Sequence, residues 1–161
     1  MPDKLQHNKG YLLIESVVAI TLLVVGFLGM LALLSNSIAL NRVINDQFIA
    51  NYLAAEGIEI IKNLIDSNVI QGKPWNENIN AGDFEVDYQS SQLEPNQGRP
   101  ILFDENIKKY GYGSGNQTFF KRKISVDFVS PEQVKVNSIV NWSTRKGKFE
   151  INLEDHFFNW K

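Results

Sequence analysis

A long uncharged stretch near the N-terminus dominates the hydropathy pattern of this chain. Residues 17–34, VVAITLLVVGFLGMLALL, carry no charge, and extending the stretch back to Tyr11 adds one acid, Glu15. A helix rises about 1.5 Å per residue, so about 20 apolar residues cover the hydrocarbon core of a bilayer. The pattern predicts a transmembrane helix over residues 11–35. A buried core helix is the alternative, but a chain of 161 residues has no core able to surround such a segment.

The helical pattern continues beyond the predicted membrane span. Residues 38–66 contain no proline and only one glycine, Gly57. More than half of the helix circumference is apolar, which predicts that residues 36–70 pack on a head and also against other subunits. A coiled-coil dimer is the alternative, and it is disfavoured because no strict heptad is kept. One stripe of the helix is polar and consists of Asn41, Asn45, Tyr52, Glu56, Glu59 and Asn63.

The pattern changes at residues 71–76, QGKPWN, where helix-breaking residues gather. Downstream, alternation with period two predicts β-strands and turns. The expected fold class is α+β, in which the second half of a long N-terminal helix packs on a small antiparallel β-sheet head over residues 71–161. The predicted strands lie at 84–88, 101–103, 118–128, 134–142 and 148–153, with a hairpin connection at 143–147.

Charge and composition exclude several classes of protein. Sixteen basic and 18 acidic residues give a net charge of −2, and the short basic run at 121–123 is too little for a nucleic-acid binder. The absence of cysteine excludes disulfides, thiolate metal sites and a cysteine nucleophile. Lys4 and Lys9 precede the apolar stretch and no basic residue follows it before Arg42, which predicts a cytoplasmic N-terminus and an extracytoplasmic head. A cleaved secretory signal peptide is disfavoured because the stretch is too long.

Candidate catalytic and binding groups are sparse in the predicted head. His156 is expected to be an ordinary surface residue, and the GYGSG segment at 111–115 lacks the Lys-Ser/Thr end of a phosphate-binding loop. Asp83, Glu85 and Asp87 alternate as on a solvated strand edge rather than in a compact calcium loop. We therefore expect no catalytic residue, no metal site and no cofactor.

The residues around the single acid of the apolar stretch form a specific motif. A short basic leader ends in Gly10, and YLLIES follows at residues 11–16. This string resembles the N-terminal cleavage and methylation motif of type IV prepilins and type II secretion pseudopilins. In that family an inner-membrane peptidase cuts after the glycine and methylates the new N-terminus. Leu12 departs from the pattern, since threonine or serine is more common there.

The resemblance implies a processing site and an assembly residue. It implies cleavage after Gly10, which removes residues 1–10 as a leader, then N-methylation at Tyr11 and a role for Glu15 in assembly. Cleavage creates a positive α-amine at Tyr11, and pairing it with a Glu15 carboxylate removes two isolated charges from a low dielectric. Residues 54–63 and 134–161 are similar to the corresponding segments of PilV-type minor pilins.

A minor pilin or pseudopilin is therefore the expected function, that is, a structural subunit of a type IV pilus or type II secretion-like filament with no enzymatic activity. The implied partners are a prepilin peptidase, other pilin or pseudopilin subunits, an inner-membrane assembly platform and membrane lipid, but no nucleic acid. The implied location is the inner (cytoplasmic) membrane and then a cell-surface filament. The alternative is a single-pass signal-anchored binding or sensor domain that does not polymerise.

Overall fold

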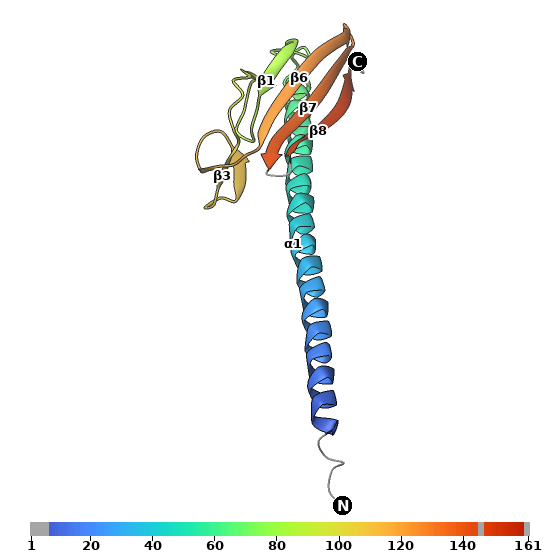
Figure 1. Cartoon of the computed structure of the whole chain (residues 1–161). Coiled ribbons are helices and arrows are strands. Elements are labelled where there is room, and N and C mark those ends of the chain that lie inside the picture. The colour runs from blue at the N-terminus through green and yellow to red at the C-terminus, as the bar shows by residue number, and fades with distance from the viewer. Residues whose placement is uncertain (1–6, 145–146, 160–161) are drawn as a thin grey trace, which may run out of the picture. The chain divides into compact units, whose positions relative to one another are not determined.

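The computed structural model describes residues 7–144 and 147–159, with only the backbone described for residues 7–9. The chain divides into two units, Met1–Asn45 and Asp46–Lys161, and each is described by itself. One helix, α1 (His7–Ile70), contributes its N-terminal part to the first unit and its C-terminal part to the second (Figure 1). It is long and apolar enough to cross a membrane, and its most apolar stretch of 18 residues has no buried residue.

Helix α1 ends where the sequence predicts helix breakers. Gly72 adopts a φ of 71°, a left-handed conformation that glycine tolerates, and its N–H donates to the carbonyl of Val69 at 3.1 Å. Pro74 follows and cannot continue the helix. The Asn68 side chain then donates to the carbonyls of Trp75 and Glu77, at 3.2 and 2.9 Å, which ties the next loop back to the helix end.

The main sheet of the head has five antiparallel strands in the order β2-β1-β6-β7-β8. The two longest neighbours, β7 and β8, form a hairpin in unbroken register from Thr144 opposite Gly147 to Gln133 opposite Phe158. Residues 145–146, at the centre of the predicted hairpin connection, lie outside the described residues. The strands are β1 (Gly82–Glu85), β2 (Glu94–Pro95), β6 (Lys121–Ser130), β7 (Gln133–Thr144) and β8 (Gly147–Phe158).

A second, smaller sheet of three strands in the order β4-β3-β5 lies in the segment between β2 and β6. Its strands are β3 (Leu102–Asp104), β4 (Lys109–Gly111) and β5 (Asn116–Gln117). A backbone bond ties the residue before β3 to the residue before β6, since Ile101 N–H donates to the Phe120 carbonyl at 2.8 Å. The sequence predicted only the β3 region of this sheet.

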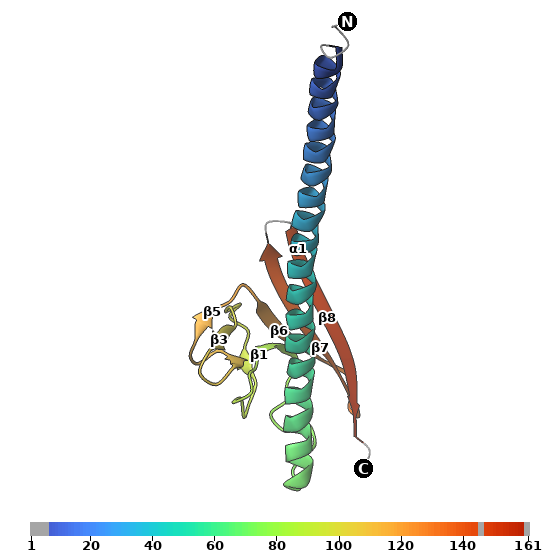
Figure 2. The ribbon, with the colours of Figure 1, turned by 90° about the horizontal axis from the view of Figure 1, so that it is seen from below.

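The core lies between the main sheet and the part of α1 that begins at Asp46 (Figure 2). Alternate residues of β6 and β7 point toward the helix, as a strand with one buried face requires. Two buried clusters fill the interface. One contains Ile60, Ile61, Ile65, Trp75, Ile79, Val86, Ile124, Val126, Val134 and Val136, and the other contains Ala50, Leu53, Ala54, Ile101, Phe120, Val140 and Trp142.

Gly57 allows the helix to approach the sheet closely. A Cβ atom placed there would lie 2.4 Å from Ser138 Oγ and 2.7 Å from Ile124 Cδ1, so any side chain at this position would force its neighbours to shift. By contrast, the glycines of the apolar stretch, Gly26 and Gly29, have nothing within 4 Å of such an atom. Tertiary packing, and not helix propensity, therefore explains why residue 57 is a glycine.

The predicted α+β fold class is confirmed, with one long N-terminal helix and an antiparallel sheet. The first predicted strand, residues 84–88, ends at Glu85 instead. Asp87 is the reason, because its Oδ1 accepts the N–H of Gln89 at 3.0 Å and so turns the chain.

Candidate functional site

The first candidate site is the apolar surface of α1 within the first unit. Large hydrophobic side chains are exposed around the whole circumference, from Tyr11 at 75% exposure to Leu33 at 72%. No described residue of this unit other than α1 itself is available to cover them. A surface of this extent in water is unfavourable by roughly 25 cal/mol per Å² of apolar area. The surface therefore requires lipid or other protein around it.

Polar groups within this surface are few, and two of them bond to the helix backbone. The hydroxyls of Ser16 and Thr21 each donate to a backbone carbonyl one turn earlier, at 2.7 Å. Glu15 differs, because its exposed carboxylate has no hydrogen-bond or ion-pair partner among the described residues. It lies one helical turn after Tyr11, on the same side of the helix.

The predicted processing site lies inside α1. The helix begins at His7, so Gly10 and the bond that follows it are helical, and a Cβ atom at Gly10 would meet nothing within 4 Å. Residues 1–6 of the predicted leader lie outside the described residues. The structure thus brings Gly10, Tyr11 and Glu15 onto neighbouring turns of one exposed helix end.

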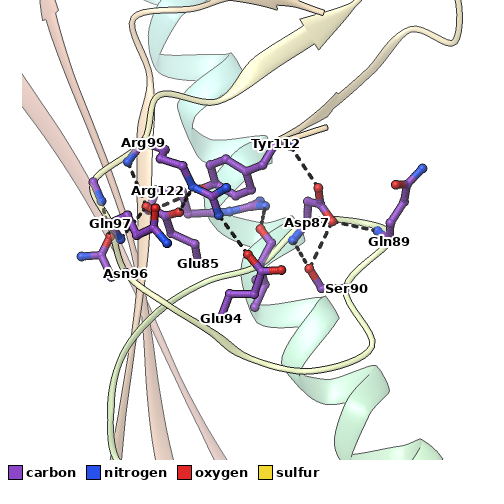
Figure 3. A network of polar contacts seen from close by, with 12 residues as sticks. Glu85, Asp87, Gln89, Ser90, Glu94, Asn96, Gln97, Arg99, Tyr112 and Arg122 are labelled. Atoms are coloured by element: carbon purple, nitrogen blue, oxygen red, sulfur yellow. Dashed lines mark hydrogen bonds and ion pairs between the residues drawn. The ribbon is translucent and has the colours of Figure 1, made fainter. Parts of the chain in front are cut away.

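The second candidate site is a network of polar side chains within the head (Figure 3). Arg122, on β6, is buried, and its guanidinium reaches three acceptors in two other segments of the chain. Nη1 donates to the Leu53 carbonyl and to Glu56 Oε2, both at 2.8 Å, and Nη2 donates to the Val86 carbonyl. The Arg122 side chain therefore joins α1 to the segment that follows β1.

Glu85 is the buried acid of this network. Its side chain is fully buried, and Oε1 accepts the N–H groups of Gln97 and Arg99 at 3.0 and 2.9 Å. Its Oε2 accepts Arg99 Nε at 2.6 Å, while Arg99 also pairs with Glu94 at 3.0 Å. These bonds raise the pKa of Arg99, with the Glu85 hydrogen bond as the largest cause.

Asp87 and Tyr112 complete the network. Asp87 Oδ2 accepts the N–H of Tyr112 at 3.0 Å, and its Oδ1 also accepts the Ser90 hydroxyl at 3.1 Å. The Arg99 guanidinium lies 4.8 Å from the centre of the Tyr112 ring, in a cation–π contact. Burial raises the pKa of Tyr112 to about 12. The network therefore ties the segment that follows β1 to the segment that follows β4.

The prediction of a solvated edge at Asp83, Glu85 and Asp87 is wrong for two of the three. Only Asp83 is exposed, and it pairs with Lys123 at 3.0 Å, a contact that lowers its pKa. Glu85 and Asp87 are buried because backbone N–H groups of the following loops need acceptors.

Sequence reasoning also missed Arg122 and the inward role of Glu56. A signal was available in the alternation of β6, because Arg122 stands between Phe120 and Ile124 on the strand face that is otherwise apolar. The helical periodicity places Glu56 on the polar stripe, but its side chain is half-buried and pairs with Arg122. A buried arginine on an apolar strand face predicts a partner acid on the opposing helix.

His156 is half-buried rather than fully exposed at the surface. Its Nδ1 lies 2.7 Å from Gln133 Nε2, and its Nε2 lies 3.2 Å from Glu154 Oε1. Hydrogen bonds from Asn137 and His156 lower the pKa of Glu154, in that order of size. Across residues 7–144 and 147–159, no group of three histidine or acidic side chains is arranged to hold a metal ion.

Comparisons with known proteins identify no relative. No family model, no curated protein and no solved structure matches the chain. Any statement of function therefore depends on the geometry of the two sites and on the resemblance of the N-terminal motif.

Proposed function

We propose that this protein is a minor pilin or pseudopilin, a subunit that is held in the inner membrane by α1 and then assembled through it into a filament. One observation carries the proposal. The apolar surface of α1 contains a single charged group between Tyr11 and Leu34, the Glu15 carboxylate, which has no partner among the described residues. A plain membrane anchor needs no acid at that depth, and an acid there is costly.

Processing would supply the missing partner. Cleavage after Gly10 leaves a protonated amine on Tyr11, and the helix places that amine one turn from Glu15. When subunits gather side by side, the amine of one and the carboxylate of another neutralise each other inside the apolar bundle. A shift of register by one turn would leave both charges unpaired in a low dielectric, so the pair selects one register.

The mass of the mature protein tests the proposal directly. The full chain is produced in cells that carry a prepilin peptidase and a filament assembly system, and it is extracted from the membrane. We expect a product that begins at Tyr11 and carries one added methyl group. A product that retains residues 1–10 would overturn the proposal and favour a signal-anchored binding or sensor domain.

The role of Glu15 is tested separately from cleavage. Glu15→Gln keeps the size of the side chain and removes its charge, so we expect normal membrane insertion and leader removal. Recovery of the protein in sheared filaments should fall about ten-fold or more, because one buried amine then stays unpaired. Glu59→Gln is the matched control, since Glu59 is an exposed acid of the same helix whose one ion pair with a described residue is to Lys62 at 3.8 Å. Equal recovery of both variants would contradict the role of Glu15.

A further inference from the structure

An apolar groove of about 480 Å³ opens in the head beside the first turns of α1 that belong to it. Phe48 and Tyr52 line one wall, and their rings lie 5.2 Å apart with 62% and 68% of these residues exposed. Tyr88, from the segment after β1, and Tyr110, in β4, also line the groove. Four aromatic rings around an open groove form a surface that favours an apolar side chain from a partner.

The rim of this aromatic groove is positively charged. Lys108 and Lys109 stand at the rim, where Lys109 Nζ lies 4.6 Å from the centre of the Tyr88 ring. Lys108 has no ion-pair partner among the described residues. The one acid of the groove, Glu56, is already paired with Arg122 at 2.8 Å. The occupant that fits is therefore an apolar side chain accompanied by a negative charge.

Such a combination is present at the other end of the same helix segment. Ile70, the last residue of α1, is 85% exposed, and Asp66, one turn earlier, is exposed without an ion-pair partner among the described residues. The last turn of α1 also contains no basic residue, so the partial negative charge of the helix C-terminus is not offset there. We call Asp66 and Ile70 the acidic knob.

The groove and the knob cannot meet within one copy. Phe48 and Asp66 are separated by 18 residues, as are Tyr52 and Ile70. Eighteen residues correspond to five turns of 3.6 residues, so both features lie on the same side of the helix about 27 Å apart. Consider a second copy whose helix runs parallel to the first and faces it. If this copy is displaced along the helix axis by five turns, its groove lies opposite the knob of the first copy.

We propose that the acidic knob of one copy docks into the aromatic groove of a second copy, with Ile70 among the rings and Asp66 beside Lys108. The interface is head-to-tail, so each copy keeps a free groove at one end and a free knob at the other, and the contact repeats without closing. This inference rests on the proposed filament function and adds to it a contact between heads, separate from the packing of the N-terminal helices.

Cysteine cross-linking tests the contact cleanly because the chain contains no cysteine. The full chain with Tyr52→Cys and Ile70→Cys is assembled and then oxidised. A disulfide needs Cα atoms within about 7 Å, so a bond between these positions can form only between copies. We expect a ladder of dimers, trimers and larger species, whereas each single variant should give no ladder.

A matched control tests the displacement of five turns. Tyr52→Cys combined with Asn63→Cys uses a second exposed position on the same side of the helix, 11 residues away, about 16 Å along the axis. We expect at least about ten-fold less ladder from this pair. Equal or greater cross-linking through position 63 would overturn the proposal.

Charge reversal tests the Lys108–Asp66 contact. Lys108→Glu in the Tyr52→Cys and Ile70→Cys background should reduce the ladder by about five-fold, because an exposed ion pair contributes up to about 1 kcal/mol. Adding Asp66→Lys should restore the ladder. If Asp66→Lys reduces the ladder further instead of restoring it, the Lys108–Asp66 contact is contradicted.

The two proposals fail in distinguishable ways. If leader removal and filaments are normal and depend on Glu15 but the 52–70 ladder is missing, the groove contact is wrong and the proposed function stands. If the leader is retained and no filament forms, the proposed function is wrong and the groove contact falls with it.

Discussion

The two parts of α1 share one backbone conformation but have opposite surroundings. Before Asn45 the large hydrophobic side chains of the described helix are exposed, up to 75% at Tyr11, except for the half-buried Val43. After Asp46 one side of the helix is covered by the sheet, and Leu53 and Ile61 are almost fully buried. The head thus covers apolar side chains of its own part of the helix. The apolar side chains of the N-terminal part need lipid or another protein to cover them.

The glycines and polar groups follow the same division. Gly57 is required by contact with Ser138 and Ile124, while Gly26 and Gly29 touch nothing. The acid of the head part that faces the sheet, Glu56, pairs with Arg122 at 2.8 Å, whereas Glu15 has no such partner among the described residues. This contrast teaches that the N-terminal part of α1 carries features that only an external partner can explain.

The largest expected effect tests the network that fixes the second part of the helix. Arg122→Met removes the bonds to Leu53 and Val86 and leaves Glu56 half-buried without its partner. We expect the free energy of unfolding of the head to fall by about 3–5 kcal/mol. Urea unfolding in detergent, followed by fluorescence of the buried Trp75 and Trp142, measures it. A change below about 1 kcal/mol would show that the network is not needed for stability.

A pair of leucine variants compares the two parts of the helix directly. Leu53→Ala creates a cavity in the head core and should lower the free energy of unfolding by about 2–5 kcal/mol. Leu33→Ala, at a position 72% exposed, should leave head unfolding unchanged in detergent. The same tryptophan fluorescence assay measures both. Similar losses in the two variants would mean that the two units unfold as one.

A pair of glycine variants gives a smaller effect of the same kind. Gly57→Ala forces a Cβ atom against Ser138 and Ile124, so we expect a loss of about 1–3 kcal/mol in the thermal stability of the head. Gly29→Ala has open space and should raise helix stability by about 0.5–1 kcal/mol. Circular dichroism during thermal unfolding distinguishes them. A stable Gly57→Ala variant would refute the close approach of helix and sheet.

The smallest expected effect is a pH dependence confined to the head. Burial raises the pKa of Tyr112 to about 12, above its ordinary value of 10.0. Since the folded pKa is the higher one, the contribution of Tyr112 to stability is complete below pH 10 and is lost as the pH rises toward 12. Tyr112→Phe should therefore show a shallower loss of stability over this interval. An identical slope in both proteins would contradict the burial of this phenol.

Much of the fold could be predicted because its signals are local. The uncharged stretch, the breakers at 71–76 and the period-two alternation each depend on neighbours in sequence, and they place α1 and most of the main sheet correctly. Strands β2, β4 and β5 have two or three residues each and were not predicted. Segments so short contain no period, and they are extended only because neighbouring strands supply hydrogen bonds.

The polar groups of the head show the limit of sequence reasoning. Asp83, Glu85 and Asp87 alternate in the same way, yet one is a surface residue and two are buried acceptors. Their partners stand far away in the chain, 25 residues for Asp87 and Tyr112 and 40 residues for Asp83 and Lys123. Periodicity along one strand carries no information about which distant N–H group will need an acceptor.

By itself, the sequence determined that this chain has an apolar helix, an acid near its start and a β-rich head, because hydropathy and helix breaking act between adjacent residues. Only the tertiary structure decided which side of α1 is covered, why Gly57 is a glycine, and that Arg122 joins helix to sheet. Those features depend on the distance between elements far apart in the chain, and close packing sets that distance.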